Sequence, residues 1–466
     1  MSDCAKNRIL LISYHFPPSA AIGGTRVANF AKWLPSFGWE ARILTIQDRD
    51  VEQFDTERLH DVEGTTIYKA GVWPTLAALY GSVKGRLFGS RGITEETVRP
   101  PGESAGPASV RRESFAERLR RYALSFLSLP DFERGWIVPA MIAAVRRVRR
   151  DRIGWIMTSC PPYSVHLVGL GVKGITGARW VADFRDPWMT TGSKRSYATC
   201  ALSIRLESWL ERKVIERADL LLFGVERLKE AYRQRYAHVP GEKFVFLPNG
   251  IAPRALEAAA PAAKYERFTL SYTGSIYVRR SPEPVFQAIS RLVQEGRISI
   301  EDVCIKLVGQ CRTVEGVPTA LLARKYGLER VVEIHDPRPS SEAQEIIRRS
   351  HLALLFAPHL PYQIPAKAYD YLAAGARILA IAEDGGTADL VRSTDSGETF
   401  RSEDVDGIKD FIHREMTRRG SPSPIRVAGL GRFDARRITE ELAGRLDRIS
   451  ATGSADAPAP ADAPHS

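Results

Sequence analysis

Residues 364–380 read IPAKAYDYLAAGARILA, a stretch in which a polar helix start runs into a small-residue turn and then an apolar strand. The pattern predicts a helix from about Lys367 to Ala374, a cap at Gly375 and a buried strand, because glycine commonly follows the last helical turn. In open parallel sheets, ligands bind where helix N-termini meet the carboxyl ends of strands. Lys367 and Asp370 are therefore expected to face a nucleotide, although an ordinary helix-to-strand turn has the same pattern.

The composition is typical of a globular protein with an anionic partner. At 466 residues the chain is long enough for about two to three domains, with 44% hydrophobic and 26% charged residues. No apolar run reaches the roughly 18 residues that a membrane-spanning helix needs. The formal net charge of +11 favours a nucleotide, a nucleic acid or an anionic lipid as partner, and charge alone does not choose among them.

The N-terminal residues and the cysteines favour a cytoplasmic location. The N-terminus passes straight into a predicted strand, without the basic region and cleavage site of an export signal. The cysteines are odd in number and scattered, and none belongs to a C-x-x-C pair. This distribution predicts reduced thiols, without a disulfide framework or a zinc site, at Cys4, Cys160, Cys200, Cys304 and Cys311.

The first half of the chain has the alternating rhythm of a parallel α/β sheet. A strand at Arg8–Tyr14 is followed by Gly23, Gly24 and a helical pattern, and further strands are predicted at 41–46 and 65–70. Glycines before a helix allow backbone amides to approach an anion, so this loop is a candidate ligand site. A plain turn is the alternative.

The rhythm is interrupted from about residue 73 to residue 134, which we interpret as an insertion. Within it, Glu113–Leu129 predicts an amphipathic helix with aromatic and apolar residues on one face. Residues 111–152 contain eleven arginines and five acids, an excess of six positive charges. Such a helix would dock on anionic lipid or cover the core of its own domain, and the sequence leaves both possibilities open.

A predicted strand at Arg179–Phe184 delivers three charged residues, Asp183, Arg185 and Asp186, to its carboxyl end. That end is the functional edge of a parallel sheet. Charged side chains are costly to bury unless they are paired. The three residues are therefore expected either to form a local ion network or to face a polar ligand.

A second α/β unit follows an Ala- and Pro-rich linker. Its first strand ends at Gly274 and Ser275, and Arg279 and Arg280 come just before the next predicted helix. Paired arginines beside helix amides would suit a diphosphate, because guanidinium groups bind phosphate oxygens in a bidentate manner. A solvated surface pair is the alternative. Gly309 ends the next predicted strand in the same way.

These segments, in this order, resemble the retaining glycosyltransferases of family 4. The stretch at 364–380 resembles the branch that writes its donor-sugar motif as P-x-K-x-x-E-Y-L-A-x-G-x-P. The matching positions are Lys367, Tyr371, Leu372, Ala373 and Gly375. Three positions depart from the family: Asp370 replaces Glu, Arg377 replaces Pro, and Tyr362 stands where the two-glutamate version has its first acid.

The resemblance implies an α/β protein with two Rossmann-like doubly wound domains facing a cleft, the GT-B arrangement. The expected divisions are an acceptor-side domain at 1–250, a linker at 251–264 and a nucleotide-sugar domain at 265–424. Final helices at 425–450 are expected to pack back towards the first domain. Residues 451–466 are rich in Ala, Pro, Ser and Asp, and they are expected to be disordered.

The resemblance also implies the reaction: transfer of a sugar, with retention, from a nucleotide diphosphate sugar to a glycan or lipid-linked acceptor in cell-surface polysaccharide biosynthesis. No cofactor and no metal are expected. Asp370 would hold the ribose hydroxyls. The implied catalytic residues are Asp183, Arg185 and Asp186. The implied donor-binding residues are Gly23, Gly24, Gly274, Ser275, Arg279, Arg280, Gly309, Lys367 and Asp370.

Two other functions remain open at this stage. A nucleotide-sugar epimerase would share the architecture and the donor chemistry. A basic nucleic-acid-binding protein would explain the net charge, but no nucleic-acid-binding motif and no aromatic-basic stacking platform is visible in the sequence. The protein is therefore expected to be a cytoplasmic enzyme without a nucleic-acid partner, with peripheral association with the inner face of the membrane as an extension of this hypothesis.

Overall fold

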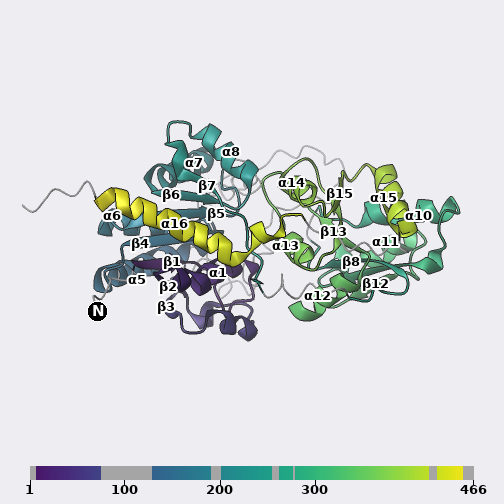
Figure 1. Cartoon of the computed structure of the whole chain (residues 1–466), viewed down its shortest axis with the longest axis horizontal. Helices are drawn as coiled ribbons and strands as arrows, with labels where there is room; N and C mark the ends of the chain where they lie inside the picture. The colour runs from purple at the N-terminus through teal and green to yellow at the C-terminus, as the bar shows by residue number, and fades with distance from the viewer. Residues whose placement is uncertain are drawn as a thin grey trace, which may run out of the picture.

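The computed structural model describes residues 7–74, 129–189, 201–253, 262–276, 279–418 and 428–454. These residues form two parallel sheets with helices on both faces, side by side along the long axis of the molecule (Figure 1). The protein is thus built from two doubly wound α/β domains in the GT-B arrangement, as the sequence predicts.

The first sheet has seven strands in the order β3-β2-β1-β4-β5-β6-β7. Successive side chains of a strand point to opposite faces, so Ile9 and Leu11 of β1 belong to one core, and Leu10 and Ile12 belong to the core on the other face. The strands are β1 (Asn7–Ile12), β2 (Trp39–Ile46), β3 (Thr66–Ala70), β4 (Trp155–Cys160), β5 (Arg179–Phe184), β6 (Leu220–Phe223) and β7 (Phe244–Phe246).

The helices of the first domain are divided between the two faces of this sheet. One face packs against α5 (Ile137–Arg150), α6 (Ser164–Thr176), α7 (Ala201–Arg217) and α8 (Glu226–Arg235). The opposite face packs against α1 (Thr25–Trp33) and α16 (Ala435–Ser454). Short 3-10 turns include η1 (Ile22–Gly24), η4 (Thr56–Val62), η5 (Phe132–Trp136) and η10 (Leu430–Phe433).

The second sheet has six strands in the order β12-β9-β8-β13-β14-β15, and a two-stranded hairpin, β10-β11, projects beside it. The strands are β8 (Phe268–Thr273), β9 (Val303–Val308), β10 (Thr313–Val314), β11 (Val317–Pro318), β12 (Val332–His335), β13 (Leu352–Phe356), β14 (Arg377–Ile381) and β15 (Gly397–Phe400). The helices are α10 (Glu283–Gln294), α11 (Thr319–Lys325), α12 (Ser340–Arg349), α13 (Ala366–Ala373), α14 (Gly386–Ser393) and α15 (Val405–Thr417).

The chain crosses between the domains twice, and the two crossings lie side by side. The backbone N–H of Ile251 donates to the carbonyl of Phe433 at 2.6 Å, and the N–H of Ala435 donates to the carbonyl of Ile251 at 3.0 Å. A Cβ on Gly250 would lie 2.9 Å from Cα of Ala435, which is closer than real Cβ atoms approach. Glycine therefore permits the close contact of the two crossing segments.

Helix α16 returns to the first domain and lies along it (Figure 1). Its Ile438, Leu442 and Leu446 are buried in the core with α1. The indoles of Trp39 and Trp155 donate to its C-terminal half, to Asp447 at 3.0 Å and Ser450 at 3.1 Å. The helix continues to Ser454, past residue 451, where the sequence predicts the start of the tail.

The predicted insertion leaves and rejoins the first domain at neighbouring points. The backbone N–H of Trp73 donates to the carbonyl of Gly135 at 3.0 Å, and the indole of buried Trp136 donates to the carbonyl of Ala70 at 3.2 Å. Nearly all of the predicted helix at 113–129 lies outside the described residues. Among the helices that are described, none is long and apolar enough to cross a bilayer.

Candidate active site

The candidate site lies where the carboxyl ends of both sets of strands face each other. Two polar contacts join the domains there. Arg227 of α8 forms a bidentate ion pair with Asp384 at 2.8 Å and a second ion pair with Asp389 of α14. The amide of Gln363, just before α13, donates to Oδ1 of Asp186 at 2.8 Å. Residues far apart in sequence therefore form one cleft.

Two glycines allow the loops on the second-domain side of the site to approach each other closely. Gly274 and Gly309 follow β8 and β9 with φ of 120° and 126°, in the region that favours glycine. A Cβ on Gly309 would lie 2.3 Å from the carbonyl oxygen of Gly274, and a Cβ on Gly274 would lie 2.6 Å from Nζ of Lys367. The absence of side chains at these positions thus brings the two loops and the lysine together.

Lys367, in the first turn of α13, provides a half-buried positive charge. Its Nζ lies 3.8 Å from the ring centroid of Tyr272, a cation–π contact. Burial, with a further contribution from the charge of Arg280, lowers the pKa of Lys367 to about 7. An anion bound beside the ammonium group would offset both effects, so the arrangement favours an anionic ligand.

Asp370 lies one turn further along α13 and is exposed, although surrounding atoms partly desolvate its carboxyl group. This desolvation raises the pKa of Asp370 to about 6, and the charges of Lys367 and Arg58 oppose the shift. Arg58 belongs to η4 of the first domain. Its guanidinium donates to three consecutive backbone carbonyls, at Ser19, Ala20 and Ala21.

The two predicted arginines have different surroundings. Arg279 has a φ of 67°, its side chain is exposed, and its backbone N–H donates to Glu315 of the β10-β11 turn at 2.9 Å. Arg280 is half-buried and close enough to Lys367 to lower its pKa. Ser275 donates to Gln310 at 3.3 Å. Arg280 is therefore the arginine on the side of Lys367.

Arg185 anchors the loop that carries Gly23. Its guanidinium donates to the backbone carbonyls of Cys160 at 2.8 Å, Pro161 at 2.9 Å and Gly23. A Cβ on Gly23 would lie 3.2 Å from this guanidinium, and a Cβ on Gly24 would lie 3.1 Å from Cα of Phe16. Both glycines accordingly lie against the protein, and Arg185 holds the loop in position.

Asp183 is fully buried and forms an ion pair inside the first domain. Its carboxylate accepts from Nε of Arg26 at 3.0 Å and from the hydroxyl of Ser159 at 2.7 Å. The same arginine donates to the carbonyls of Leu247 at 2.8 Å and Pro248 at 2.5 Å. Asp183 thus belongs to the local ion network that the sequence left open as one of two possibilities.

Asp186 has a different environment. It is half-buried, and it accepts a hydrogen bond from Gln363 of the other domain. The residues that follow it are held by helix α7: the indole of Trp188 donates to Glu207 at 3.0 Å, and the N–H of Met189 donates to Glu211 at 2.6 Å. Of the three charged residues at the carboxyl end of β5, Asp186 is therefore the one that faces the second domain.

The sequence did not indicate Gln363 or Arg58. Gln363 lies in a loop without helical or strand periodicity, and Arg58 lies in a 3-10 segment far from any motif. Gln363 acquires its place through a contact across the cleft, whereas Arg58 is held by carbonyls of its own domain and affects Asp370 through its charge. A charge or amide placed by chain topology leaves no local pattern, so periodicity and motif spacing give no signal for these two residues.

Two Asp-x-Asp sequences occur in the chain, at 48–50 and 404–406, and neither forms a metal site in the structure. Asp48 pairs with Lys69 at 2.6 Å, and Asp404 caps the N-terminus of α15 by accepting from the N–H of Gly407 at 3.0 Å. Among the described residues, no group of three or more His, Cys, Asp or Glu side chains is arranged to hold a metal ion.

The family of the chain follows from its first domain. Residues 23–250 match the family model described as the Glycosyl transferase 4-like domain. The first domain belongs to this family. The protein is therefore a glycosyltransferase of the family 4 type. No curated protein sequence matches the chain.

Solved structures with the same fold span almost the whole glycosyltransferase at low sequence identity. HepE from Anabaena, in complex with UDP and glucose, is 14% identical, with a TM-score of 0.59 and coverage of 95% of this chain and 100% of that chain. WaaG, a glycosyltransferase involved in lipopolysaccharide biosynthesis, is 14% identical, with a TM-score of 0.53 and coverage of 95% and 99%. The trehalose 6-phosphate synthase of Burkholderia multivorans is 12% identical, with a TM-score of 0.59 and coverage of 98% and 100%.

The different surroundings of the two aspartates predict different effects of the same substitution. Asp183→Asn leaves the buried guanidinium of Arg26 without its counter-charge, and we expect a loss of about 3–5 kcal/mol in the free energy of unfolding. Asp186→Asn keeps an oxygen for Gln363 at a half-buried position, and we expect a loss of about 1 kcal/mol or less. Urea unfolding of both variants measures the difference. Equal losses would contradict this assignment.

Proposed function

We propose that the protein transfers a sugar from a nucleoside diphosphate sugar to a glycan or lipid-linked acceptor in cell-surface polysaccharide biosynthesis. The observation that carries the proposal is the grouping of Lys367, Arg280 and Asp370 around the glycine loops at the carboxyl ends of β8 and β9. Two cations would bind the diphosphate. One carboxylate would accept hydrogen bonds from the ribose hydroxyls.

Departure of the nucleoside diphosphate is the step that these cations would assist. As the bond from the anomeric carbon to the diphosphate oxygen breaks, negative charge grows on the leaving group. The ammonium of Lys367 and the guanidinium of Arg280 would stabilise that charge, together with the backbone N–H groups at the start of α13. The protein's own positive charges would thus supply what a metal ion supplies in other transferases, and we propose that the reaction needs no metal.

The first domain would contribute the acceptor side of the reaction. We propose that Asp186 contacts the reacting sugar or the acceptor hydroxyl. Its carboxylate lies on the cleft and accepts a hydrogen bond from the amide of Gln363 at 2.8 Å. Asp183 and Arg185, with their backbone and ion-pair partners, would maintain the walls around it. We further propose a cytoplasmic location with peripheral association with the inner face of the membrane, where a lipid-linked acceptor would be held.

An epimerase acting on a nucleotide sugar is the second candidate for this cleft, since it would bind the same donor. The two functions differ in their need for an acceptor. A transferase releases nucleoside diphosphate in step with glycosylation of an acceptor, whereas an epimerase of this kind would release a free sugar without one. Product analysis in the absence of any acceptor separates them.

The donor is tested by thermal unfolding in the presence of UDP, GDP and ADP sugars, each with excess EDTA. A donor present at one hundred times its dissociation constant adds about 2.7 kcal/mol to the free energy of unfolding, so the melting temperature should rise by several degrees. The stabilising donor should then support diphosphate release in EDTA. Failure of every donor to stabilise the protein would overturn the donor site, and strict dependence of turnover on added Mg²⁺ or Mn²⁺ would overturn the metal-free mechanism.

Donor affinity should depend on pH through Lys367. Its pKa of about 7 means that the free protein loses this charge as the pH rises through neutrality, whereas a bound diphosphate favours the charged form. Binding of the nucleoside diphosphate should therefore weaken between about pH 7 and pH 9 and take up a proton in that range. Calorimetry in buffers of different ionisation enthalpy measures this uptake.

Lys367→Met is the matched variant for this measurement. It should bind the nucleoside diphosphate roughly tenfold or more weakly and without proton uptake, because a hydrogen bond to a charged group contributes about 1.5–3 kcal/mol. The empty variant should also melt at a higher temperature than the wild type below pH 7, where the cost of burying the charged lysine is fully present; this advantage should disappear as the pH approaches 10.5. Proton uptake by the variant equal to that of the wild type would refute the assignment.

The contact between Gln363 and Asp186 predicts an unusual pH response in Gln363→Glu. Two carboxylates at this separation repel when both are ionised and share a proton at lower pH. We expect kcat of the variant, relative to wild type, to fall roughly tenfold or more at pH 8 and to recover towards pH 5, with little change in the donor KM. Gln363→Ala lacks the acid and should stay impaired at every pH. A constant ratio of Gln363→Glu to wild-type kcat would show that the contact is merely structural.

A further inference from the structure

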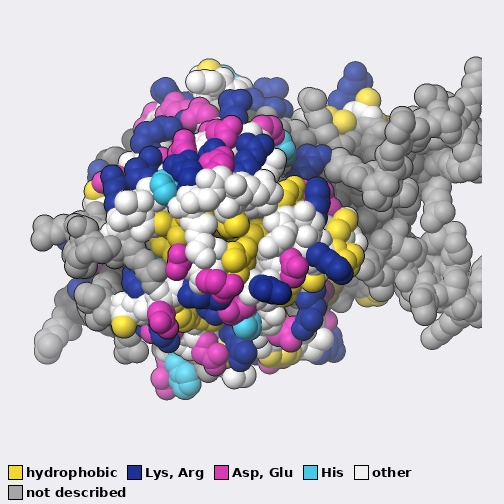
Figure 2. Space-filling model, turned by 90° about the vertical axis from the view of Figure 1, so that its right-hand side faces the viewer, with side chains coloured by type: hydrophobic (Ala, Val, Ile, Leu, Met, Phe, Trp, Pro, Cys, Tyr) yellow, Lys and Arg dark blue, Asp and Glu magenta, His cyan; other side chains and the backbone are white. Residues whose placement is uncertain are grey.

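One helix of the first domain carries a dense cluster of arginines. The outer end of the second domain mixes basic and acidic side chains across its surface (Figure 2). By contrast, the last turns of α5 carry Arg146, Arg147, Arg149 and Arg150 in five consecutive residues. Within the described part of the chain, no ion pair joins Arg146, Arg149 or Arg150 to an acid.

The outer face of α5 continues this basic end with apolar residues. Val138 and Ile142 are 40% and 39% exposed, and with Arg146 and Arg149 they follow the i, i+4, i+8, i+11 spacing of a single helical stripe. The inner face is small and buried, with Ala140, Ala144 and Val148 packed on the sheet. The sheet-facing contacts of α5 are therefore satisfied by small residues, while larger apolar side chains point outward.

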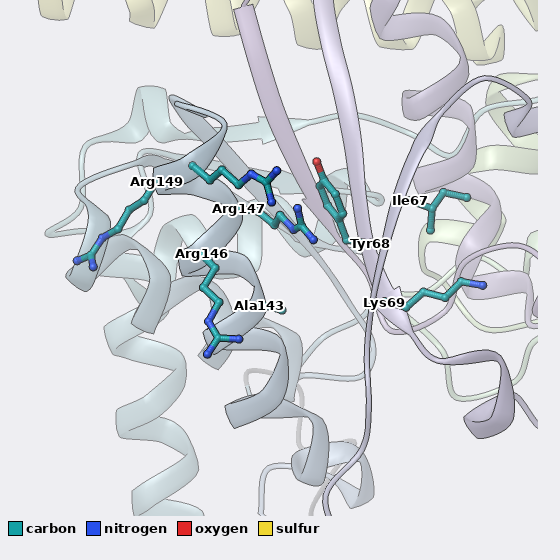
Figure 3. Close-up of a pocket in the computed structure, with 8 residues that line it drawn as sticks. Ile67, Tyr68, Lys69, Ala143, Arg146, Arg147 and Arg149 are labelled. Atoms are coloured by element: carbon teal, nitrogen blue, oxygen red, sulfur yellow. The ribbon is translucent and has the colours of Figure 1, made fainter.

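The arginines border a groove of about 850 Å³ between the end of α5 and the edge strand β3 (Figure 3). Arg147 points towards Tyr68 and lies 4.2 Å from its ring centroid, whereas Arg146 and Arg149 point away from the strand. Arg149 donates to the carbonyl of Ile175 at 3.3 Å. These contacts orient the guanidinium groups beside an open surface rather than inside the core.

Helix α7 adds exposed apolar residues on the same face of the sheet. It packs beside α6, as α5 does on the other side, and the three helices share one core. Leu202, Leu206 and Trp209 of α7 are 62%, 39% and 52% exposed and follow the i, i+4, i+7 spacing of one stripe. We define the α5–α7 face by Val138, Ile142, Arg146, Arg149, Arg150, Leu202, Leu206 and Trp209.

We propose that the α5–α7 face docks the protein on an anionic lipid bilayer. A bilayer surface accepts both kinds of side chain on this face: its phosphates attract the arginines, and its acyl boundary takes up exposed Leu, Ile and Trp side chains. A soluble anion or a nucleic acid backbone would pair with the arginines but would leave the aliphatic side chains in water. The combination of charges and apolar side chains therefore selects the lipid surface.

The orientation of α5 connects this surface to the cleft. Trp136, just before the helix, donates to the carbonyl of Ala70 at the carboxyl end of β3, and Arg8 at the start of β1 donates to the carbonyl of Asp151 just after it. The apolar half of α5 therefore lies nearer the edge of the sheet that carries Asp186. Docking through this face would hold the acceptor side of the cleft close to the membrane. This placement helps catalysis if the acceptor is lipid-linked, as the proposed function has it.

The test is co-sedimentation of the full-length protein with phosphatidylcholine vesicles and with vesicles in which part of this lipid is replaced by phosphatidylglycerol. Arg146→Glu with Arg149→Glu removes the basic part, and Ile142→Ser with Trp209→Ser removes the apolar part. Arg437→Glu with Arg448→Glu is the matched control, because both arginines are exposed on α16, which covers the opposite face of the sheet. Stabilisation by the nucleotide-sugar donor, measured in solution, is expected to be unchanged in all three.

We expect the wild type and the α16 control to bind the anionic vesicles, and the arginine variant to partition at least about tenfold less. The apolar variant should also bind less, at both low and high salt. Unchanged binding by the two α5–α7 variants, or an equal loss in the α16 control, would overturn the proposal. Loss of binding to a DNA duplex in the arginine variant, with no vesicle binding by the wild type, would overturn it in favour of a nucleic-acid surface.

Discussion

The buried ion pair between Arg26 and Asp183 is the contact on which the arrangement of the first domain depends. The two side chains are 4% and 0% exposed, so their charges are stabilised by each other and by the surrounding polar groups. One guanidinium joins the end of β5, the start of α1 and the carbonyls of Leu247 and Pro248, where the chain leaves the domain. Arg26 therefore fixes the point at which the chain leaves the first sheet towards the second domain.

The charged residues around the cleft fall into two groups. Some are occupied by partners within the protein, and others are available to a ligand. On the first-domain side, Asp183 and Arg185 are occupied by backbone and ion-pair partners, and Asp186 remains directed towards the other domain. On the second-domain side, Lys367 is held at an energetic cost, since burial and Arg280 both disfavour its charged form. A site that is electrostatically unfavourable when empty binds an anionic donor strongly, at the expense of stability in the free protein.

Much of the fold follows from local pattern. Strand β5 has the predicted bounds, Arg179–Phe184, because a buried parallel strand is a short apolar run that the flanking residues delimit clearly. Gly375, with a φ of 62°, ends α13 as a glycine cap should. The order of the motifs along the chain also indicated a two-domain glycosyltransferase; the two sheets confirm the domains, and the family match of residues 23–250 confirms the type of enzyme.

The roles of the site residues were decided by tertiary structure. The sequence determined that Asp183, Arg185 and Asp186 would arrive together at the end of one strand, but it did not determine which of them would be buried. That outcome depends on partners such as Arg26, 157 residues away, and Gln363, 177 residues away, which chain topology places beside β5. Periodicity records whether a side chain faces the core or the solvent. The partner that it meets there is set only when the two domains and both sheets have come together.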